Sequence, residues 1–136
     1  ARALGIDVPK SNKYGAKATY HNGVRYDSRA EAERAAELDA MLAAGEISGW
    51  TRQVRFHLGC PENKYVADFV VWQQWLAYRN PTGKSPFAVW VEDVKGHRTA
   101  KFAHDLKLWK RYGPFDLHIL KRQGNGWQRE AVSNTK

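Results

Sequence analysis

Two runs of β-branched and aromatic residues each carry an acid into a stretch that should form an apolar strand. The first run covers residues 65–69 (YVADF) and the second covers residues 89–96 (VWVEDVKG). In the second run Asp93 and Lys95 stand two residues apart, so on a strand both side chains point to the same face. Charged groups on a largely buried face are costly unless they are paired or bind an ion. The two runs therefore indicate a polar site built into a sheet.

Length and charge limit what such a site can serve. The 136 residues are enough for one domain with a core of its own, and the 43% of hydrophobic residues argue against disorder. The formal net charge is +8, from 22 Lys and Arg against 14 Asp and Glu. This balance favours an anionic partner, most simply nucleic acid. The alternative is that the surplus charge only keeps the protein soluble.

The single cysteine, Cys60, excludes an internal disulfide and argues against a structural zinc site. No apolar run is long enough for a membrane span, and the first residues lack the apolar core of a signal peptide. We therefore expect a cytoplasmic protein that does not bind membranes.

The first half of the chain predicts an arm, a hairpin and a helix. Residues 1–16 are polar and basic and are expected to form a flexible arm. Asn22-Gly23 predicts a tight turn between two short strands. Ser28 followed three residues later by Glu31 predicts a helix N-terminus, and the alanine-rich segment after it predicts a helix that runs to Ala44 and is capped by Gly45.

The second half predicts strands around a second helix. Strands are expected at residues 51–58, 64–78, 87–95 and 115–120, and a helix at residues 99–112. Short turn-rich links favour an antiparallel meander of the first three strands. The helix then permits a right-handed crossover to a parallel last strand. We expect an α/β (α+β) domain over residues 17–122, with a mixed sheet flanked by helices and a polar tail at residues 123–136.

The phase of the first helix places one acid on its inward side. Leu38, Met41 and Leu42 mark the buried stripe, with Ala35 one turn earlier, and Glu31 lies seven residues before Leu38, or two turns. Glu33 would lie about 200° around the helix from Glu31. An acid in line with the core stripe favours a functional role for Glu31. The alternative is that Glu31 only closes the capping box with Ser28.

The strand acids also share a face with apolar neighbours. Asp68 alternates with Val66 and Val70, and Asp93 alternates with Val89 and Val91. Taken alone, Asp68 is better explained as a buried acid that backbone donors or a nearby arginine satisfy.

For Asp93 and Lys95 the alternative is a simple ion pair. Taken together, the acids and the lysine have the composition of a metal site. Asp68 and Asp93 supply the hard oxygens that Mg²⁺ or Mn²⁺ prefers, and the Val94 carbonyl can add another. Lys95 can orient or help deprotonate a water molecule or stabilise charge on a phosphate, and Glu31 can complete the metal shell.

This arrangement resembles the PD-(D/E)XK nuclease superfamily, whose fold is named after restriction endonucleases. Asp68 matches the first acid, Asp93-Val94-Lys95 matches the (D/E)XK half, and Glu31 matches the acid of the preceding helix. The local sequence is closer still to a phage-borne family related to Holliday-junction resolvases, over roughly residues 13 to 120. The matching segments are Lys13-Tyr14, Tyr26-Asp27-Ser28, Glu31-Ala32-Glu33-Arg34, Tyr65 to Phe69 and Glu92 to Gly96.

The resemblance implies a restriction-endonuclease-like core and Mg²⁺-dependent hydrolysis of DNA. Glu31, Asp68, Asp93 and Lys95 would be catalytic, and the Val94 carbonyl would join the acids as a metal ligand. The substrate would be branched DNA, such as a four-way junction, in phage recombination or DNA processing, and symmetric cutting would need a homodimer. Ala67 stands where the superfamily name has proline, a position at which that proline is commonly absent.

Several other side chains are candidates for weaker roles. The expected contacts with DNA phosphates come from basic side chains, and solvated surface charge is the alternative for each of them. These side chains are Lys13, Lys17, His97, Arg98, Lys101 and Lys107. Trp72, Trp75 and Trp90 are expected in the core, or else at a dimer contact. A metal site of His57, His97 and His104 is disfavoured, because no Cys or acid completes the set.

Two other functions remain open from the sequence. One is a basic nucleic-acid-binding protein without catalysis, which would bind DNA with strong salt dependence. The other is an interaction protein that acts on a host factor through its cationic surface. The acid, acid and lysine set argues against pure binding, because acids that face phosphates weaken binding.

Overall fold

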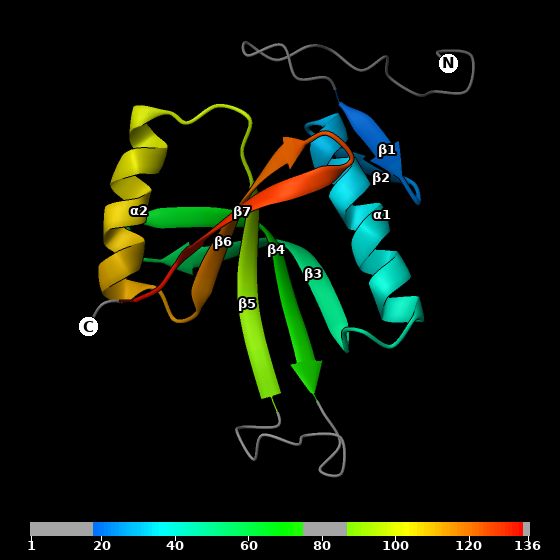
Figure 1. Cartoon of the computed structure of the whole chain (residues 1–136). Helices are drawn as coiled ribbons and strands as arrows, with labels where there is room; N and C mark the ends of the chain where they lie inside the picture. The colour runs from blue at the N-terminus through cyan, green and yellow to red at the C-terminus, as the bar shows by residue number, and fades with distance from the viewer. Residues whose placement is uncertain (1–17, 75–86, 135–136) are drawn as a thin grey trace. The chain divides into compact units, whose positions relative to one another are not determined.

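The structure is a computed structural model that describes residues 18–74 and 87–134, and these form a mixed α and β fold (Figure 1). The α/β class predicted from the sequence is confirmed. The chain divides into two compact units, residues 1–40 and 41–136. The elements in chain order are β1 (Thr19–His21), β2 (Val24–Tyr26), α1 (Arg29–Ala43), β3 (Gly49–His57), β4 (Lys64–Gln74), β5 (Phe87–Val94), α2 (Ala100–Tyr112), β6 (Asp116–Gln123) and β7 (Gly126–Val132).

The first unit begins with the predicted hairpin. Strands β1 and β2 pair antiparallel, with His21 opposite Val24, so Asn22 and Gly23 form a two-residue turn. Both turn residues have positive φ, 49° and 76°, as a type I′ turn requires. The His21 Nε2 atom lies 2.7 Å from Asp39 Oδ2, which ties the hairpin to α1.

Helix α1 begins and ends near the predicted positions. The Ser28 hydroxyl accepts a hydrogen bond from the Glu31 amide at 3.1 Å, which confirms the predicted N-cap. Gly45 has φ 76°, its amide donates to the Leu42 carbonyl, and the Glu46 amide donates to the Met41 carbonyl. These two bonds are those of a Schellman motif, so the helix ends at Ala43 and Gly45 is its cap.

The buried stripe of α1 is shorter than predicted. Ala35 and Leu38 are fully buried, as expected. The prediction for Leu42 was wrong, because its side chain is 42% exposed in the last turn of the helix. The stripe starts earlier instead, with Ala32, and the charged side chain of Arg34 is also buried.

The second unit carries a sheet with strand order β3-β4-β5-β6-β7. Strands β3, β4 and β5 form the predicted antiparallel meander. Strand β6 pairs parallel with β5, and α2 makes the crossover between them, which confirms the predicted parallel last strand. The end of the predicted second strand, residues 75–78, lies outside the described residues, as do Lys13, Lys17 and Trp75.

The C-terminal segment is a strand rather than the predicted polar tail. Strand β7 pairs antiparallel with β6. Leu117 lies opposite Val132 and Gln123 lies opposite Gly126, so Gly124 and Asn125 form a two-residue turn. Most β7 side chains are exposed, so this segment lacks the alternation of apolar and polar residues that predicts a strand. Val132 is the buried exception and belongs to the core.

Helix α2 covers one face of the sheet and supplies Phe102 and Trp109 to the core (Figure 1). The Thr99 hydroxyl caps it by accepting the Phe102 amide at 3.1 Å. The Trp109 ring is fully buried and meets the Phe56 and Tyr65 rings edge-on, at centroid distances of 5.1 and 5.6 Å. Within the described residues, no helix is long and apolar enough to cross a membrane.

Replacing Val132 with Asp should lower the free energy of unfolding by about 3 kcal/mol or more, because it buries an unpaired charge against β6 and the core. Urea unfolding followed by tryptophan fluorescence measures this. Ala131→Asp is the matched control, because Ala131 is the exposed neighbour on the same strand. Equal stability of the two variants would mean that β7 does not contribute to the core.

Candidate active site

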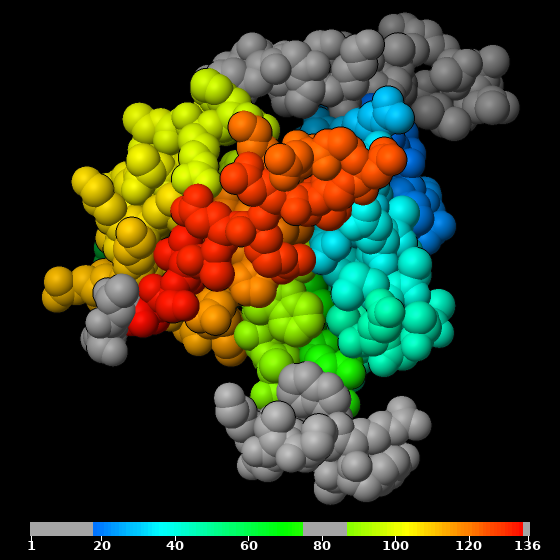
Figure 2. All heavy atoms as spheres, viewed as in Figure 1, coloured from blue at the N-terminus to red at the C-terminus, as the bar shows by residue number. Residues whose placement is uncertain are grey.

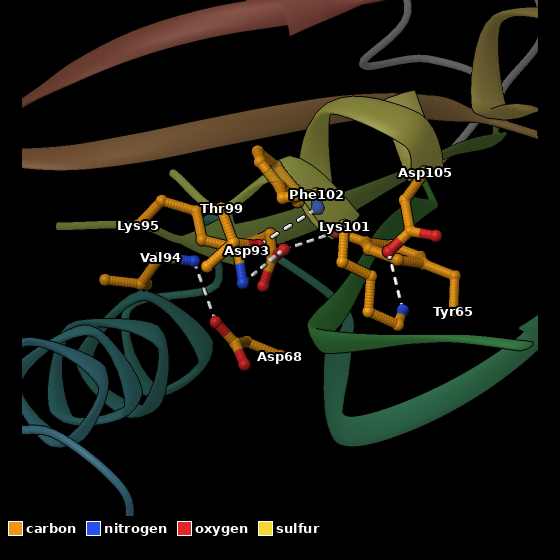
Figure 3. Close-up of polar contacts among 9 residues, drawn as sticks. All are labelled: Tyr65, Asp68, Asp93, Val94, Lys95, Thr99, Lys101, Phe102 and Asp105. Atoms are coloured by element: carbon orange, nitrogen blue, oxygen red, sulfur yellow. Dashed lines mark hydrogen bonds and ion pairs between the residues drawn. The ribbon is translucent and has the colours of Figure 1, made fainter. Parts of the chain in front are cut away.

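The antiparallel pairing of β4 and β5 brings the two predicted strand acids together. Phe69 lies opposite Glu92, and the next position in this register sets Asp68 opposite Asp93. The Asp68 Oδ2 atom accepts a hydrogen bond from the Val94 amide at 2.8 Å (Figure 3). This bond fixes Asp68 to β5, the strand that carries Asp93 and ends just before Lys95.

Asp93 is the most deeply buried acid of this group. Its side chain is inaccessible to solvent, and its Oδ2 atom accepts a hydrogen bond from the Tyr65 hydroxyl. The same oxygen lies 3.3 Å from the Lys95 Nζ atom. Its other oxygen, Oδ1, is buried and has no hydrogen-bond partner among the described residues. A buried carboxylate oxygen without a donor is rare and calls for a water molecule, an ion or a catalytic role.

Lys95 connects this buried acid to the surface. It follows the end of β5, and its amide donates to the Leu120 carbonyl of β6 at 2.9 Å, so its backbone is fixed. Its side chain is 30% exposed, whereas that of Asp93 is 1% exposed. The Nζ atom lies 4.8 Å from the centroid of the Phe102 ring, a cation–π distance. The ammonium group is therefore held between a buried carboxylate and solvent.

Tyr65 is the site residue that the sequence analysis missed. Burial raises the pKa of the Tyr65 hydroxyl far above its usual value, and the charge of Asp93 and the hydrogen bond to it raise this pKa further. Weaker contributions come from Asp68 and Asp105. Because this pKa is raised, the Tyr65 hydroxyl is protonated at neutral pH and donates to Asp93. A tyrosine in an apolar strand carries no sign of this contact in the sequence.

The two apolar neighbours predicted to share a face with Asp68 differ in burial. Val66 is 44% exposed whereas Val70 is buried, so these two neighbours of Asp68 lie in different environments. On β3 the position opposite Asp68 is Gln53, flanked by the Arg52–Phe69 and Val54–Ala67 pairs. Gln53 has φ 53°, a conformation that interrupts the regular pleat. On β4 itself, burial alternates up to Asp68 and is continuous from Phe69 to Val71.

The alternation predicted for Asp93 fits the structure. Val91 belongs to the core that α2 covers, and Val89 packs against that core. The neighbouring Glu92 is fully buried too, but it contacts the Trp90 indole at 2.9 Å and lies 3.6 Å from an Arg129 nitrogen. Since successive strand residues face opposite sides, Asp93 rather than Glu92 is the acid that lies with Lys95.

Glu31 belongs to the other unit of the chain. It lies in the first turn of α1 and its side chain is half-buried. The contact of its amide with Ser28 is the capping role described above. Its participation in the metal site remains a prediction from the sequence.

The predicted cations on and before α2 are exposed, and two of them have acidic partners. Arg98 pairs with Glu130 at 2.8 Å, and Lys101 pairs with the buried Asp105 at 2.9 Å, as Figure 3 shows for the second pair. His97 and Lys107 are exposed. Trp72 and Trp90 are both half-buried, which leaves the dimer contact a prediction.

Metal binding here rests on two aspartates and on any further donors that complete a shell. In the described ranges no group of three or more His, Cys, Asp or Glu side chains is placed to hold an ion. His57, His97 and His104 therefore do not form such a group there. Mg²⁺ commonly uses one or two protein carboxylates and keeps several waters. Asp68 fits this limited donor set, and so does Asp93, whose Oδ1 atom has no hydrogen-bond partner in the described part of the chain. Val94 meets Asp68 through its amide, and a metal contact of its carbonyl stays a prediction.

Replacing Tyr65 with Phe should lower the free energy of unfolding by about 1.5 to 3 kcal/mol, since it removes a donor from a buried charged acceptor. Chemical unfolding near neutral pH measures this. Tyr112→Phe on the exposed side of α2 is the control and should change stability little. A stable Tyr65→Phe protein would show that Asp93 does not need this hydroxyl.

Comparison with known proteins gives a family. A family model matches residues 11–123, and its description is "Protein of unknown function (DUF1064)". The match ends where β6 ends and leaves out β7. No curated protein and no solved structure matches the chain. Because the family model covers well over half of the 136 residues, the chain belongs to the DUF1064 family.

Proposed function

We propose that this protein is a divalent-metal-dependent endonuclease that hydrolyses phosphodiester bonds in DNA. The observation that supports it best is the state of Asp93. This acid is fully buried, shares one oxygen between Tyr65 and Lys95, and has no donor for its other oxygen among the described residues. An acid kept only for stability would be expected to have both oxygens satisfied.

Asp68 and Asp93 are the side chains that would hold Mg²⁺ or Mn²⁺, with the Val94 carbonyl and Glu31 as the further ligands that the resemblance implies. A bound divalent ion supplies positive charge for the phosphoryl oxygens and makes a coordinated water more acidic. The contact of Asp68 with the Val94 amide holds its carboxylate in place. The Tyr65 hydroxyl holds the Asp93 carboxylate in the same way. Because this hydroxyl stays protonated, it does not compete with Asp93 as an anionic metal ligand.

Lys95 is the residue that meets the substrate in this proposal. Its ammonium group is partly exposed and already lies beside Asp93, so it is placed to contact an incoming phosphate. A positive charge held in a poorly hydrated site stabilises charge on phosphoryl oxygens more than a solvated lysine does. Phe102 covers the ammonium group on another side and limits its hydration.

The substrate follows from charge and from the resemblance. A net charge of +8 favours a polyanion such as DNA. The similarity to the resolvase-related phage family supports branched DNA, a homodimer and a role in DNA recombination or processing in the cytoplasm. These finer assignments rest on that similarity alone.

A second candidate is a DNA-binding protein without catalysis. It is favoured by the pairing of the acids with cations, Asp93 with Lys95 and Asp105 with Lys101, since paired acids can serve stability alone. The lack of a third metal-binding side chain near them, among the residues the structure describes, points the same way. The two candidates differ in whether Asp93 is needed for cutting.

Asp93→Asn should reduce Mg²⁺-dependent cutting of DNA by about 100-fold or more, because it removes a metal-binding charge. Gel analysis of labelled DNA measures this, with EDTA as the metal-free arm. Calorimetric titration with Mn²⁺ should show binding to the wild type and none to the variant. Asp116→Asn, at an exposed position on β6, is the matched control and should behave as the wild type.

Either of two results would contradict this assignment. Metal-dependent cutting that survives Asp93→Asn would assign the chemistry to other residues. Tight DNA binding by the wild type without cutting in Mg²⁺ or Mn²⁺ would favour the non-catalytic candidate.

A four-way junction should be cut at least about tenfold faster than a linear duplex of the same arm sequence, because the resemblance implies selection of branched DNA rather than base sequence. Single-turnover cutting of both labelled substrates measures this. Paired symmetric cuts would support a homodimer. Equal rates on both substrates would keep the nuclease chemistry and remove the branched-DNA assignment.

A further inference from the structure

A polar pocket of about 340 Å³ is lined in part by Lys95. It is formed by the loop between β5 and α2 and by the hairpin of β6 and β7. In Figure 2 this loop is yellow-green and the hairpin is orange to red. The residues that matter for its chemistry are Lys95, Arg98, Ile119, Lys121, Gln128 and Glu130. We call this the Lys121 pocket.

The Lys121 pocket has an excess of positive charge. Lys95, Arg98 and Lys121 carry positive side chains, and Glu130 is the one acid among the described residues that line the pocket. Gln128 adds an uncharged amide donor. The buried side chain of Ile119 contributes an apolar part of the wall. Such a lining is suited to a small anion with several acceptor oxygens.

Two of these cations are gathered over one aromatic ring. The Lys95 Nζ atom lies 4.8 Å from the centroid of the Phe102 ring, and the Arg98 Cζ atom lies 6.0 Å from it. Both charges therefore stand close to the same buried side chain and repel each other. Each is offset by one carboxylate, Asp93 for Lys95 and Glu130 for Arg98.

The partner of Arg98 is easily displaced. The Arg98 and Glu130 side chains are 49% and 53% exposed, and an exposed ion pair of this kind contributes little net stability. A phosphate offers Arg98 two oxygens in the geometry that a guanidinium prefers. Exchange of Glu130 for a phosphate oxygen would then strengthen the contacts of Arg98.

We propose that the Lys121 pocket binds a backbone phosphate of the DNA strand, next to the phosphate that is cut. The inference rests on the proposed function, because Lys95 belongs both to the pocket and to the candidate active site. Arg98, Lys121 and Gln128 bind this phosphate and so set the position of its neighbour near Lys95. Glu130 opposes binding until Arg98 exchanges partners.

Fluorescence anisotropy of a labelled DNA duplex, with EDTA present so that no cutting occurs, tests this assignment. Lys121→Ala should weaken binding by about tenfold and reduce the slope of log affinity against log salt by about one. Lys64→Ala, at an exposed position at the start of β4, is the control for loss of one surface charge. Its effect on affinity should be smaller than about twofold.

Removing the negative charge of Glu130 is a second test, because it is expected to tighten binding rather than weaken it. Glu130→Gln should tighten DNA binding several-fold, because it releases Arg98. Asp27→Asn is matched to it, since Asp27 is the carboxylate of another exposed ion pair, with Arg25 at 3.0 Å. That control adds the same charge to the protein without altering the pocket, so its effect should be small.

Several outcomes would overturn the assignment. One is that Lys121→Ala equals Lys64→Ala and Glu130→Gln equals Asp27→Asn. Another is the absence of DNA binding by the wild type at low salt. A third is that a duplex RNA of the same sequence binds with these sensitivities while DNA does not.

The nuclease proposal fails separately from the pocket. A wild type that shows the expected binding changes but cuts no DNA would support the pocket and overturn the nuclease. A wild type that cuts DNA through Asp93, with no special effect of Lys121 or Glu130 on binding, would support the nuclease and overturn the pocket.

Discussion

The burial of the Asp93 carboxylate is the constraint around which the rest of the second unit is arranged. A buried charge is tolerated only with close partners, and here the partners come from three places in the chain. Tyr65 approaches from β4, Lys95 from the end of β5, and the parallel neighbour β6 fixes the backbone of Lys95 through Leu120. The meander and the crossover are therefore both needed to surround one acid.

Helix α2 links this acid to the hydrophobic core. Phe102 and Trp109 lie two turns apart on its buried stripe, and they serve different neighbours. Trp109 packs against Phe56 and Tyr65, which fixes the ring whose hydroxyl reaches Asp93. Phe102 lies under the Lys95 ammonium group. The same helix face that drives packing therefore also orients the polar groups of the site.

The sequence predicted the features that follow from periodicity and local chain signals. The placement of Asp68 and Asp93 on adjacent strands followed from two β-branched and aromatic runs, and the predicted helix over residues 99–112 matches α2 closely. It did not predict β7, because an edge strand with mostly exposed side chains has no apolar face. The positive φ of Gln53 and the reach of Tyr65 to Asp93, 28 residues away, depend on tertiary contacts that leave no local signal.

Lys95 explains why the site and the Lys121 pocket are best treated together. Its ammonium group lies beside Asp93, which is shielded from water, and its side chain also lines a polar pocket. An anion in that pocket would offset the charge of Lys95 from one side, while Asp93 offsets it from the other. Loss of the Asp93 or the Glu130 carboxylate leaves the repulsion between Lys95 and Arg98 over Phe102 less well offset. Under the proposed function, a strand of DNA with phosphates at regular spacing would place negative charge at both sites at once.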